Sequence, residues 1–239
     1  MLLKQVFVFI FLGFVTSCLC AVPKATKCRR EDSDCLKRSA QSLLLLLAEG
    51  KVSPQLKPLD PLRISKIEPV LSNLKFLARD FIVRGLGDCI FDNITINAAK
   101  TILNVDAHCT LVGESEYEIK GKVQNLELGA QGHLAVLFKQ LLLKIVLYIE
   151  DKKEEDKIYW HLHNWNFSYV VKEKSKINMS NLFKGSAKPT QAIQERLGET
   201  LTTLISELEP LIVDAIVNEI LENIKTYFHL LPFQELMIH

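Results

Sequence analysis

The sequence has little that would indicate catalysis or nucleic-acid binding. It contains no Gly-x-Ser-x-Gly, His-Glu-x-x-His, P-loop or Rossmann motif, which mark serine hydrolases, zinc proteases and nucleotide-dependent enzymes. Its net charge is only +1 and the basic residues are dispersed, whereas nucleic-acid-binding proteins usually carry a basic patch. We therefore expect no enzyme, no cofactor and no nucleic-acid partner. A secreted hydrolase with a site assembled from distant residues is the alternative.

The chain also lacks an apolar run long enough to span a bilayer, which takes about 20 residues. The N-terminal run Val6–Val15 is shorter and follows Lys4, as in the core of a signal peptide. Cys18 and Cys20 are small residues at −3 and −1 of a cut before Ala21. This pattern predicts a signal peptide over residues 1–20 and one secreted, extracellular domain over residues 21–239. A bacterial lipoprotein acylated on Cys18 is the alternative.

Cysteine is scarce, and neither a Cys-x-x-Cys pair nor a zinc-ligand spacing occurs. The expected mature chain keeps Cys28, Cys35, Cys89 and Cys109. An even number in an oxidising compartment predicts two disulfides, for which three connectivities are possible. A bond between Cys28 and Cys35 would tie the N-terminus to the helix that follows, and closing so short a loop contributes roughly 2–3 kcal/mol.

Helical spacing marks two segments. The first carries an apolar stripe that ends before Gly50 and consists of Leu36, Ala40, Leu43, Leu44 and Leu47. The second, Thr190–Tyr227, has a stripe of Leu and Ile with acidic residues on its other faces, which argues against stable membrane attachment. Because proline removes a backbone donor, we expect Pro210 to kink or divide this long helix.

Between Leu74 and Phe183, apolar residues recur at every second position, as in antiparallel strands with one face in water. The charged segment Asp151–Lys157 predicts a hairpin turn, and Gly129–Gly132 predicts a bend or bulge. The proline-rich segment before the strands, residues 54–64, predicts an extended connector. Because neither a one-faced sheet nor a striped helix is stable alone, we predict an α+β fold. A strongly curved antiparallel sheet wraps the long C-terminal helix, with a short N-terminal helix at one end.

The second pair of cysteines tests this strand prediction. A disulfide between Cys89 and Cys109 would join two strands that turn near residues 99–100. If Ile94 pairs with Val105, the two thiols point to opposite faces unless one extra residue intervenes. We therefore expect a one-residue bulge if the bond forms.

Three glycosylation sequons begin at Asn93, Asn166 and Asn178. Each asparagine lies on the polar parity of its expected strand, opposite the parity of apolar residues such as Ile94, Trp165 and Ile177. We therefore expect all three to project into water and to carry glycans in a secreted protein.

His161 and His163 share one parity of an expected strand, which would suit a metal ion. No third ligand lies near them in sequence, and the same parity carries Tyr159, Trp165 and Phe167. We interpret this face as an aromatic wall and expect no metal. As the alternative, the histidine side chains would contact the polar end of a ligand.

Several segments together resemble a known family. They are the pair Cys28 and Cys35, PLDPLRI (58–64), IVRGLGD (82–88), YEIKGKV (117–123), LELGAQGH (126–133), SNLFKG (180–185) and PFQEL (232–236). In this order and spacing they resemble the insect takeout and haemolymph juvenile-hormone-binding family. PLDPL with the first cysteine pair is the most specific combination, and the resemblance covers nearly all of the expected mature chain.

The resemblance implies a tubular lipid-binding fold with an apolar tunnel and a secreted carrier of a juvenile-hormone-like terpenoid, a fatty acid or a similar lipid. Periodicity indicates which strand and helix faces are apolar, and we expect those faces to form the ligand wall. The expected wall residues are Leu103, Val105, Leu134, Val136, Phe138, Leu143, Ile145, Trp165, Phe167, Tyr169, Leu201, Leu204 and Leu208. A secreted interaction protein with a filled core, acting through an unknown receptor, is the alternative.

Overall fold

The computed structural model describes residues 25–69, 73–97, 102–123, 126–182 and 191–238, with side chains of the last range from residue 197 onward. The expected signal peptide and the expected turn near residues 99–100 lie outside the described residues. The elements are α1 (Ser33–Ala48), β1 (Leu62–Ile67), β2 (Leu74–Arg84), β3 (Ile90–Asn97), β4 (Ile102–Val123), β5 (Leu126–Glu154), β6 (Lys157–Val171), β7 (Lys176–Met179), α2 (Gln191–Leu230) and α3 (Phe233–Leu236).

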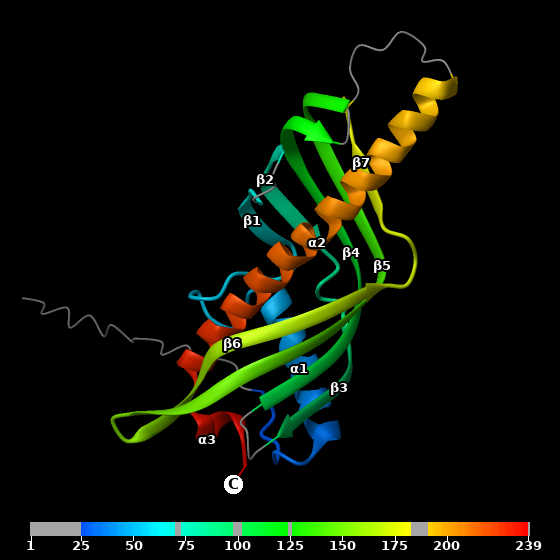
Figure 1. The fold of residues 1–239 in the computed structure, drawn as a ribbon. Helices are drawn as coiled ribbons and strands as arrows, with labels where there is room; N and C mark the ends of the chain where they lie inside the picture. Colours follow the sequence, from blue (N-terminus) through cyan, green and yellow to red (C-terminus); the bar gives the residue numbers. More distant parts are fainter. Residues whose placement is uncertain (1–24, 70–72, 98–101, 124–125, 183–190, 239) are drawn as a thin grey trace, which may run out of the picture.

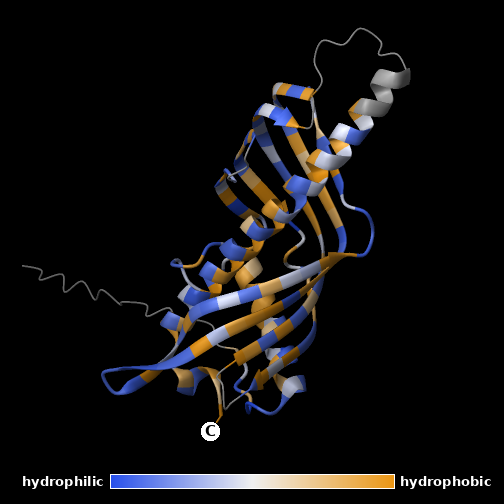
Figure 2. Ribbon diagram, in the orientation of Figure 1, coloured by the Kyte–Doolittle hydropathy of each residue, from blue (hydrophilic) through white to orange (hydrophobic). Residues whose placement is uncertain are grey.

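All seven strands form one antiparallel sheet in the order β1-β2-β4-β5-β6, with β3 paired to β4 and β7 paired to β5. The sheet bends strongly and α2 runs along it for most of the length of the molecule (Figure 1). Apolar and polar residues alternate along the strands, and the tip of the β5–β6 hairpin is polar (Figure 2). The predicted α+β fold, with a curved sheet, a long C-terminal helix and a short N-terminal helix, is confirmed.

Helix α2 is buried on more than one face. Neighbouring residues Ile212 and Val213 are both fully buried, although adjacent side chains on a helix point about 100° apart. Ile216 and Val217 repeat this pattern one turn later. A flat sheet would cover only one side of such a helix, so the sheet has to curve around it.

Register shifts supply that curvature. An extra residue in one strand bends it and increases its twist. Asp80 and Gln140, which both have positive φ, lie within two of these shifts. The extra residue lies in β2 between Arg79 and Ile82, in β5 opposite the step from Cys109 to Leu111, and in β6 opposite the step from Tyr148 to Ile149.

The last of these shifts corrects the expected face of β6. Tyr148 pairs with Asn164 and Ile149 pairs with Leu162, so His163 is the extra residue. The inward parity therefore changes along the strand: Trp160 and Leu162 are buried before the shift, and the alternate set that contains Trp165 packs inward after it. The prediction that His161, His163 and Trp165 share one face is wrong, because a bulge reverses which side chains face the core.

Helix α2 is longer and more continuous than expected. It runs from Gln191 to Leu230, past the expected end at Tyr227, and Pro210 does not divide it. A proline inside a helix forfeits one backbone hydrogen bond. Leu208 and Ile212, on either side of Pro210, are fully buried, so packing stabilises the helix on both sides of the proline.

Three smaller expectations also change. The connector before the sheet ends earlier than expected, because β1 begins at Leu62. The hairpin turn is confined to residues 155 and 156, since β5 continues to Glu154 and β6 begins at Lys157. Gly129–Gly132 lies within β5 and pairs with β4 without a register shift, so it is not a bulge.

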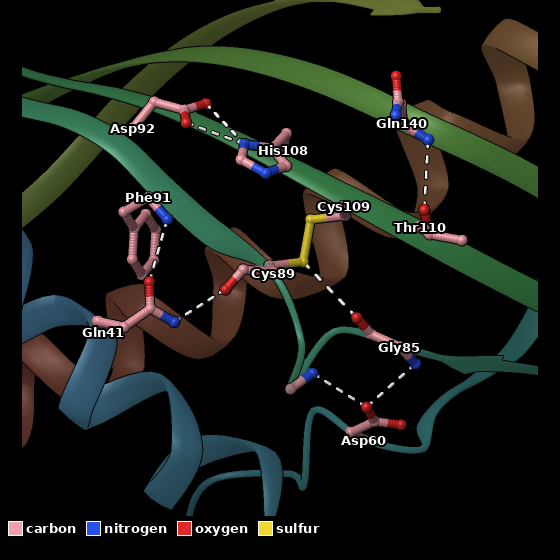
Figure 3. Close-up of a disulfide and its surroundings, with 11 residues drawn as sticks. Gln41, Asp60, Gly85, Cys89, Phe91, Asp92, His108, Cys109, Thr110 and Gln140 are labelled. Carbon is pink, nitrogen blue, oxygen red and sulfur yellow. Dashed lines mark hydrogen bonds and ion pairs between the residues drawn. A yellow bond between two sulfur atoms is a disulfide. The ribbon is translucent and has the colours of Figure 1, made fainter. Parts of the chain in front are cut away.

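Both expected disulfides are present. Cys28 is bonded to Cys35 and Cys89 is bonded to Cys109. The predicted bulge is there as well, since the pairing of β3 with β4 shifts between Phe91 and Asn93. The second bond lies where the start of β3 meets β4 (Figure 3).

Two glycines of β5 differ in what surrounds them, and this gives a matched test of the fold. A methyl group on Gly132 would lie 2.4 Å from the Ser180 carbonyl oxygen, whereas one on Gly129 would meet nothing within 4 Å. We expect Gly132→Ala to lower the free energy of unfolding by about 1–3 kcal/mol, because the backbone after β7 must move. Gly129→Ala should be neutral or stabilising by up to roughly 1 kcal/mol. Urea unfolding measures both, and equal effects of the two changes would contradict this packing.

Candidate ligand-binding site

An apolar cavity of about 210 Å³ lies at one end of the molecule, between α1, the sheet and the C-terminal end of α2. Among the described residues that line it, none carries a carboxylate, an amine, a guanidinium or an imidazole. The lining residues are Ala25, Thr26, Leu36, Ser39, Ala40, Leu43, Leu44, Leu47, Leu59, Phe91, Ile94, Leu103, Val105, Ile145, Leu147, Trp160, Ile220, Leu221, Ile224, Tyr227, Phe228, Leu236 and Met237.

Helix α1 forms one wall because its apolar stripe faces the sheet. Its first turn is attached to β3, where Ser33 Oγ donates to the Ile94 carbonyl oxygen at 2.7 Å. In its middle, the amide side chain of Gln41 donates to the Cys89 carbonyl oxygen at 2.8 Å and accepts from the Phe91 backbone amide at 3.1 Å (Figure 3). These bonds hold the helix against the start of β3, so the wall is fixed rather than loosely placed.

The C-terminal end of α1 is closed by the PLDPL segment. The backbone amides of Leu59 and Asp60 donate to the carbonyl oxygens of Leu47 and Ala48, each at 3.1 Å. Both carbonyls lie in the last turn of the helix. The Leu47 oxygen also accepts the Gly50 amide at 3.1 Å, whereas the Ala48 oxygen would otherwise lack a helical partner. Leu59 itself is buried and lines the cavity.

The Asp60 carboxylate joins two of the segments on which the family resemblance rests. Its Oδ2 atom accepts the backbone amides of Gly85 at 3.0 Å and Gly87 at 2.9 Å, in the loop after β2 (Figure 3). Gly85 has φ +98°, and a Cβ there would lie 2.4 Å from the Thr110 carbonyl oxygen. Only glycine fits that conformation without strain, which explains the first glycine of the Gly-Leu-Gly sequence.

The first disulfide fastens the start of α1 to the C-terminal segment. Asp32 caps the helix by accepting the Cys35 backbone amide at 2.9 Å. Cys28, the disulfide partner of Cys35, pairs through its backbone with Met237 in an isolated parallel β-bridge. The Ile238 amide donates to the Cys28 carbonyl oxygen at 2.9 Å. Since Met237 lines the cavity, the disulfide connects two of its walls.

An aromatic cluster closes the cavity beside β6. The Trp160 ring meets Phe228 edge-on with 5.3 Å between ring centroids, and Phe233 lies 5.7 Å from it. The Arg30 guanidinium stacks over the Phe233 ring at 4.8 Å. Edge-to-face pairs of this kind fix ring orientation, so Trp160 is held in one position.

Two of the lining residues each carry one polar atom that is buried. Trp160 Nε1 and Tyr227 Oη are both buried and have no hydrogen-bond partner within the described part of the chain. Burial raises the pKa of Tyr227 above its ordinary value. The backbone amide of Ala25 has a smaller, opposite influence on that pKa, without reaching hydrogen-bond geometry with Oη.

The structure brings only part of the expected wall to this cavity. Leu103, Val105 and Ile145 line it. Leu134, Val136, Phe138, Leu143, Leu204 and Leu208 are buried in the core but do not line it. Trp165, Phe167 and Tyr169 pack against the core outside the lining, and Leu201 borders a different hollow.

Two of these aromatic residues have partners on α2. Trp165 Nε1 donates to Asn218 Oδ1 at 2.9 Å, and the Tyr169 hydroxyl donates to Glu209 Oε1 at 3.4 Å. Burial, together with the Glu209 charge and that hydrogen bond, raises the pKa of Tyr169 to about 12. These polar contacts attach β6 to α2, so the two residues have a structural use independent of any ligand.

The remaining lining residues were not among the wall residues predicted from the sequence. They come mainly from α1, from the last turns of α2 and from Trp160. The apolar stripe of α1 was visible in the sequence, but its position over the sheet was not. Trp160 was hidden by the reversal of parity at His163.

A second hollow of about 640 Å³ lies near the other end of α2, and its lining mixes polar and apolar side chains. It is bordered by His133, Ala135, Ile177, Asn178, Met179, Ser180, Asn181, Leu182 and Leu201. On α2, Leu201 and Ile220 are about 28 Å apart at 1.5 Å per residue. Leu204, Leu208 and Ile212 between them are fully buried, so the core is packed beside that stretch of the helix.

Other candidate sites gain no support. No group of three or more metal-ligating side chains occurs within the described ranges, and His161 Nδ1 lies 3.0 Å from Glu150 Oε1. No helix among the described residues is long and apolar enough to cross a membrane. Asn93, Asn166 and Asn178 are all exposed, as a glycan would require.

Comparisons with known proteins agree with this architecture. No curated protein sequence matches the chain. Among solved structures, Takeout 1 of Epiphyas postvittana is similar, with a TM-score of 0.77 and 22% sequence identity over 89% of this chain and 99% of that one. The family model for haemolymph juvenile hormone binding protein (JHBP) matches residues 8–238. The chain therefore belongs to the haemolymph juvenile hormone binding protein family.

Proposed function

We propose that this protein is a secreted carrier that binds one small hydrophobic ligand in the cavity beneath α1. The observation that carries the proposal is the cavity itself, which is lined by apolar side chains from α1, four strands and the end of α2. Membership of the family supports it, as does the pair of disulfides, which are typical of extracellular proteins.

The size of the cavity bears on the kind of ligand. A cavity of about 150 Å³ lined by similar side chains stays dry and binds benzene. The 210 Å³ beneath α1 therefore favours a compact molecule, such as a terpenoid, over a long fully extended acyl chain. Burying roughly 300 Å² of ligand would contribute about 7 kcal/mol before the costs of binding, which is enough for micromolar affinity at best.

The name of the family refers to juvenile hormone, and a juvenile-hormone-like terpenoid is the ligand class that we favour. A fatty acid or a similar lipid is the other ligand class. A secreted interaction protein without a ligand is the second candidate function. It is favoured by the packed core beside Leu204 and Leu208 and by a cavity below the roughly 300–1,000 Å³ usual for ligand pockets.

Filling the cavity separates the two candidates. Leu43 lines it, whereas Leu45, on the same helix, is 56% exposed. We expect Leu43→Trp to weaken binding of ethylnaphthalene, an apolar probe, at least about tenfold, because the indole occupies the ligand's space. Leu45→Trp should leave the affinity unchanged. Equilibrium dialysis measures both, and equal affinities of the two variants would count against the cavity as the binding site.

Removing the first disulfide tests whether the α1 wall matters for binding. Cys28→Ser with Cys35→Ser should lower the free energy of unfolding by roughly 2–3 kcal/mol and also weaken ethylnaphthalene binding, because α1 loses its bond to the C-terminal wall. Cys89→Ser with Cys109→Ser is the matched control, since neither cysteine lines the cavity. If the first pair changes stability but not affinity, the bond is a staple and does not maintain the site.

A further inference from the structure

We propose that a row of lysines between β6 and β7, together with Lys139 of β5, binds a linear sulfated polysaccharide outside the cell. The row lies in residues 172–176, where every second residue is lysine. Four lysines and one glutamate give this region a charge of +3, in a chain whose net charge is +1. None of these lysines lines the cavity beneath α1, so the inference is independent of the carrier function.

The backbone of residues 172–176 is attached to the rest of the fold at three points. The Lys172 amide donates to the Gln140 carbonyl oxygen at 3.2 Å, and Lys176 is paired with β5 as the first residue of β7. Between them, Ser175 is buried and donates its hydroxyl to Glu209 on α2. The lysines are therefore presented from a fixed backbone.

The inward direction of Ser175 sets the outward direction of the lysines. Successive side chains of an extended chain point to opposite sides. Ser175 and Ile177 are buried, whereas Lys174 and Lys176 are exposed, as is Lys172. The loop after β6 is hydrophilic and lies on the outside of the molecule (Figure 2). Side chains two residues apart in such a chain are roughly 6–7 Å apart, so the ammonium groups form a row.

The carboxylates of this region leave the row uncompensated. Glu173, the only acidic residue of the segment, lies 3.2 Å from Lys139 through its Oε2 atom, which also places Lys139 beside the row. Glu209 contacts the segment as well, but it accepts the Ser175 hydroxyl. The three lysines of the segment have no ion-pair partner within the described ranges.

This chemistry favours a flexible polyanion over a folded protein. Protein interfaces are enriched in arginine and aromatic side chains and depleted in lysine. A lysine ammonium is a hydrated point charge on a flexible stem, and short lysine-rich segments of this kind bind heparin. Outside the cell, where disulfide-bonded proteins occur, the linear polyanions are sulfated polysaccharides.

An anionic lipid surface fits the region less well. Proteins that lie on a bilayer usually contact it through an amphipathic helix with Trp, Phe or Leu on its apolar face. The lysine segment is extended and contains none of these residues. Val170, which is exposed next to it, is a small apolar contact by comparison.

Heparin binding by the full secreted chain tests the proposal. We expect binding at low salt that weakens as salt rises, because a polyanion releases counterions when it binds lysines. Lys172→Gln with Lys174→Gln and Lys176→Gln should weaken binding at least about tenfold, since each exposed ionic contact contributes roughly twofold to fivefold. The slope of log affinity against log salt should become shallower by about 2. Arginine at the same three positions keeps the charge and should retain binding.

Three other exposed lysines provide the matched control. Lys51, Lys66 and Lys152 are each paired with a glutamate, so their replacement by glutamine removes the same formal charge from compensated positions. This triple variant should change heparin affinity less than about twofold. Thermal unfolding checks that both triple variants are folded, which we expect because all six side chains are exposed.

The outcomes distinguish the row of lysines from general charge and from other partners. Equal losses in the two glutamine triples would overturn the proposal, because net charge would then explain heparin binding. Polyglutamate that competes better than heparin would indicate an acidic protein instead. Binding to phosphatidylserine vesicles without binding to heparin would indicate a lipid surface. If the native chain does not bind heparin at low salt, the proposal is wrong, and ethylnaphthalene binding still decides the carrier function separately.

Discussion

The constraint that shapes this fold is helix α2, which has apolar side chains to bury on several of its sides. Its buried side chains include adjacent pairs such as Ile212 and Val213, so a single flat layer cannot cover it. The sheet meets this need by curving, and the curvature comes from extra residues in β2, β5 and β6. Near the N-terminal half of α2, this arrangement packs solidly around Leu204 and Leu208. Near its C-terminal end, α1 completes the enclosure and leaves a cavity.

Helix α1, which forms one wall of that cavity, is held in place along its length. Bonds from Ser33 and Gln41, the disulfide at Cys35 and the amides of the PLDPL segment hold α1 at both ends and in the middle. Because α1 is held in this way, the apolar space beneath it stays open, whereas a mobile helix would move in and fill it. Trp160 and Tyr227 line the cavity, and each buries one polar atom that has no hydrogen-bond partner within the described residues, although buried polar groups are nearly always hydrogen-bonded.

The sequence predicted the architecture better than the site. Period-two strands and an apolar-striped helix imply a wrapped helix, and the parity of Ile94 against Val105 predicted that a Cys89–Cys109 bond would require a bulge, which the structure has. Periodicity also predicted Leu103, Val105 and Ile145, which do line the cavity. It could not distinguish these from Leu134 or Phe138, because alternation identifies the inward face of a strand and not whether the space behind it is filled. Trp160 was not predicted as a wall residue because one bulged residue, His163, reverses which side chains of β6 face inward. The local sequence contains no signal for that bulge.

Organic extraction and mass spectrometry of the natively folded, secreted protein test the central claim most directly. The account predicts close to one apolar molecule per chain, released on unfolding. Repeated preparations that yield no such molecule, from protein that also fails to take up an apolar fluorescent lipid, would contradict it and leave a filled-core interaction protein as the better description.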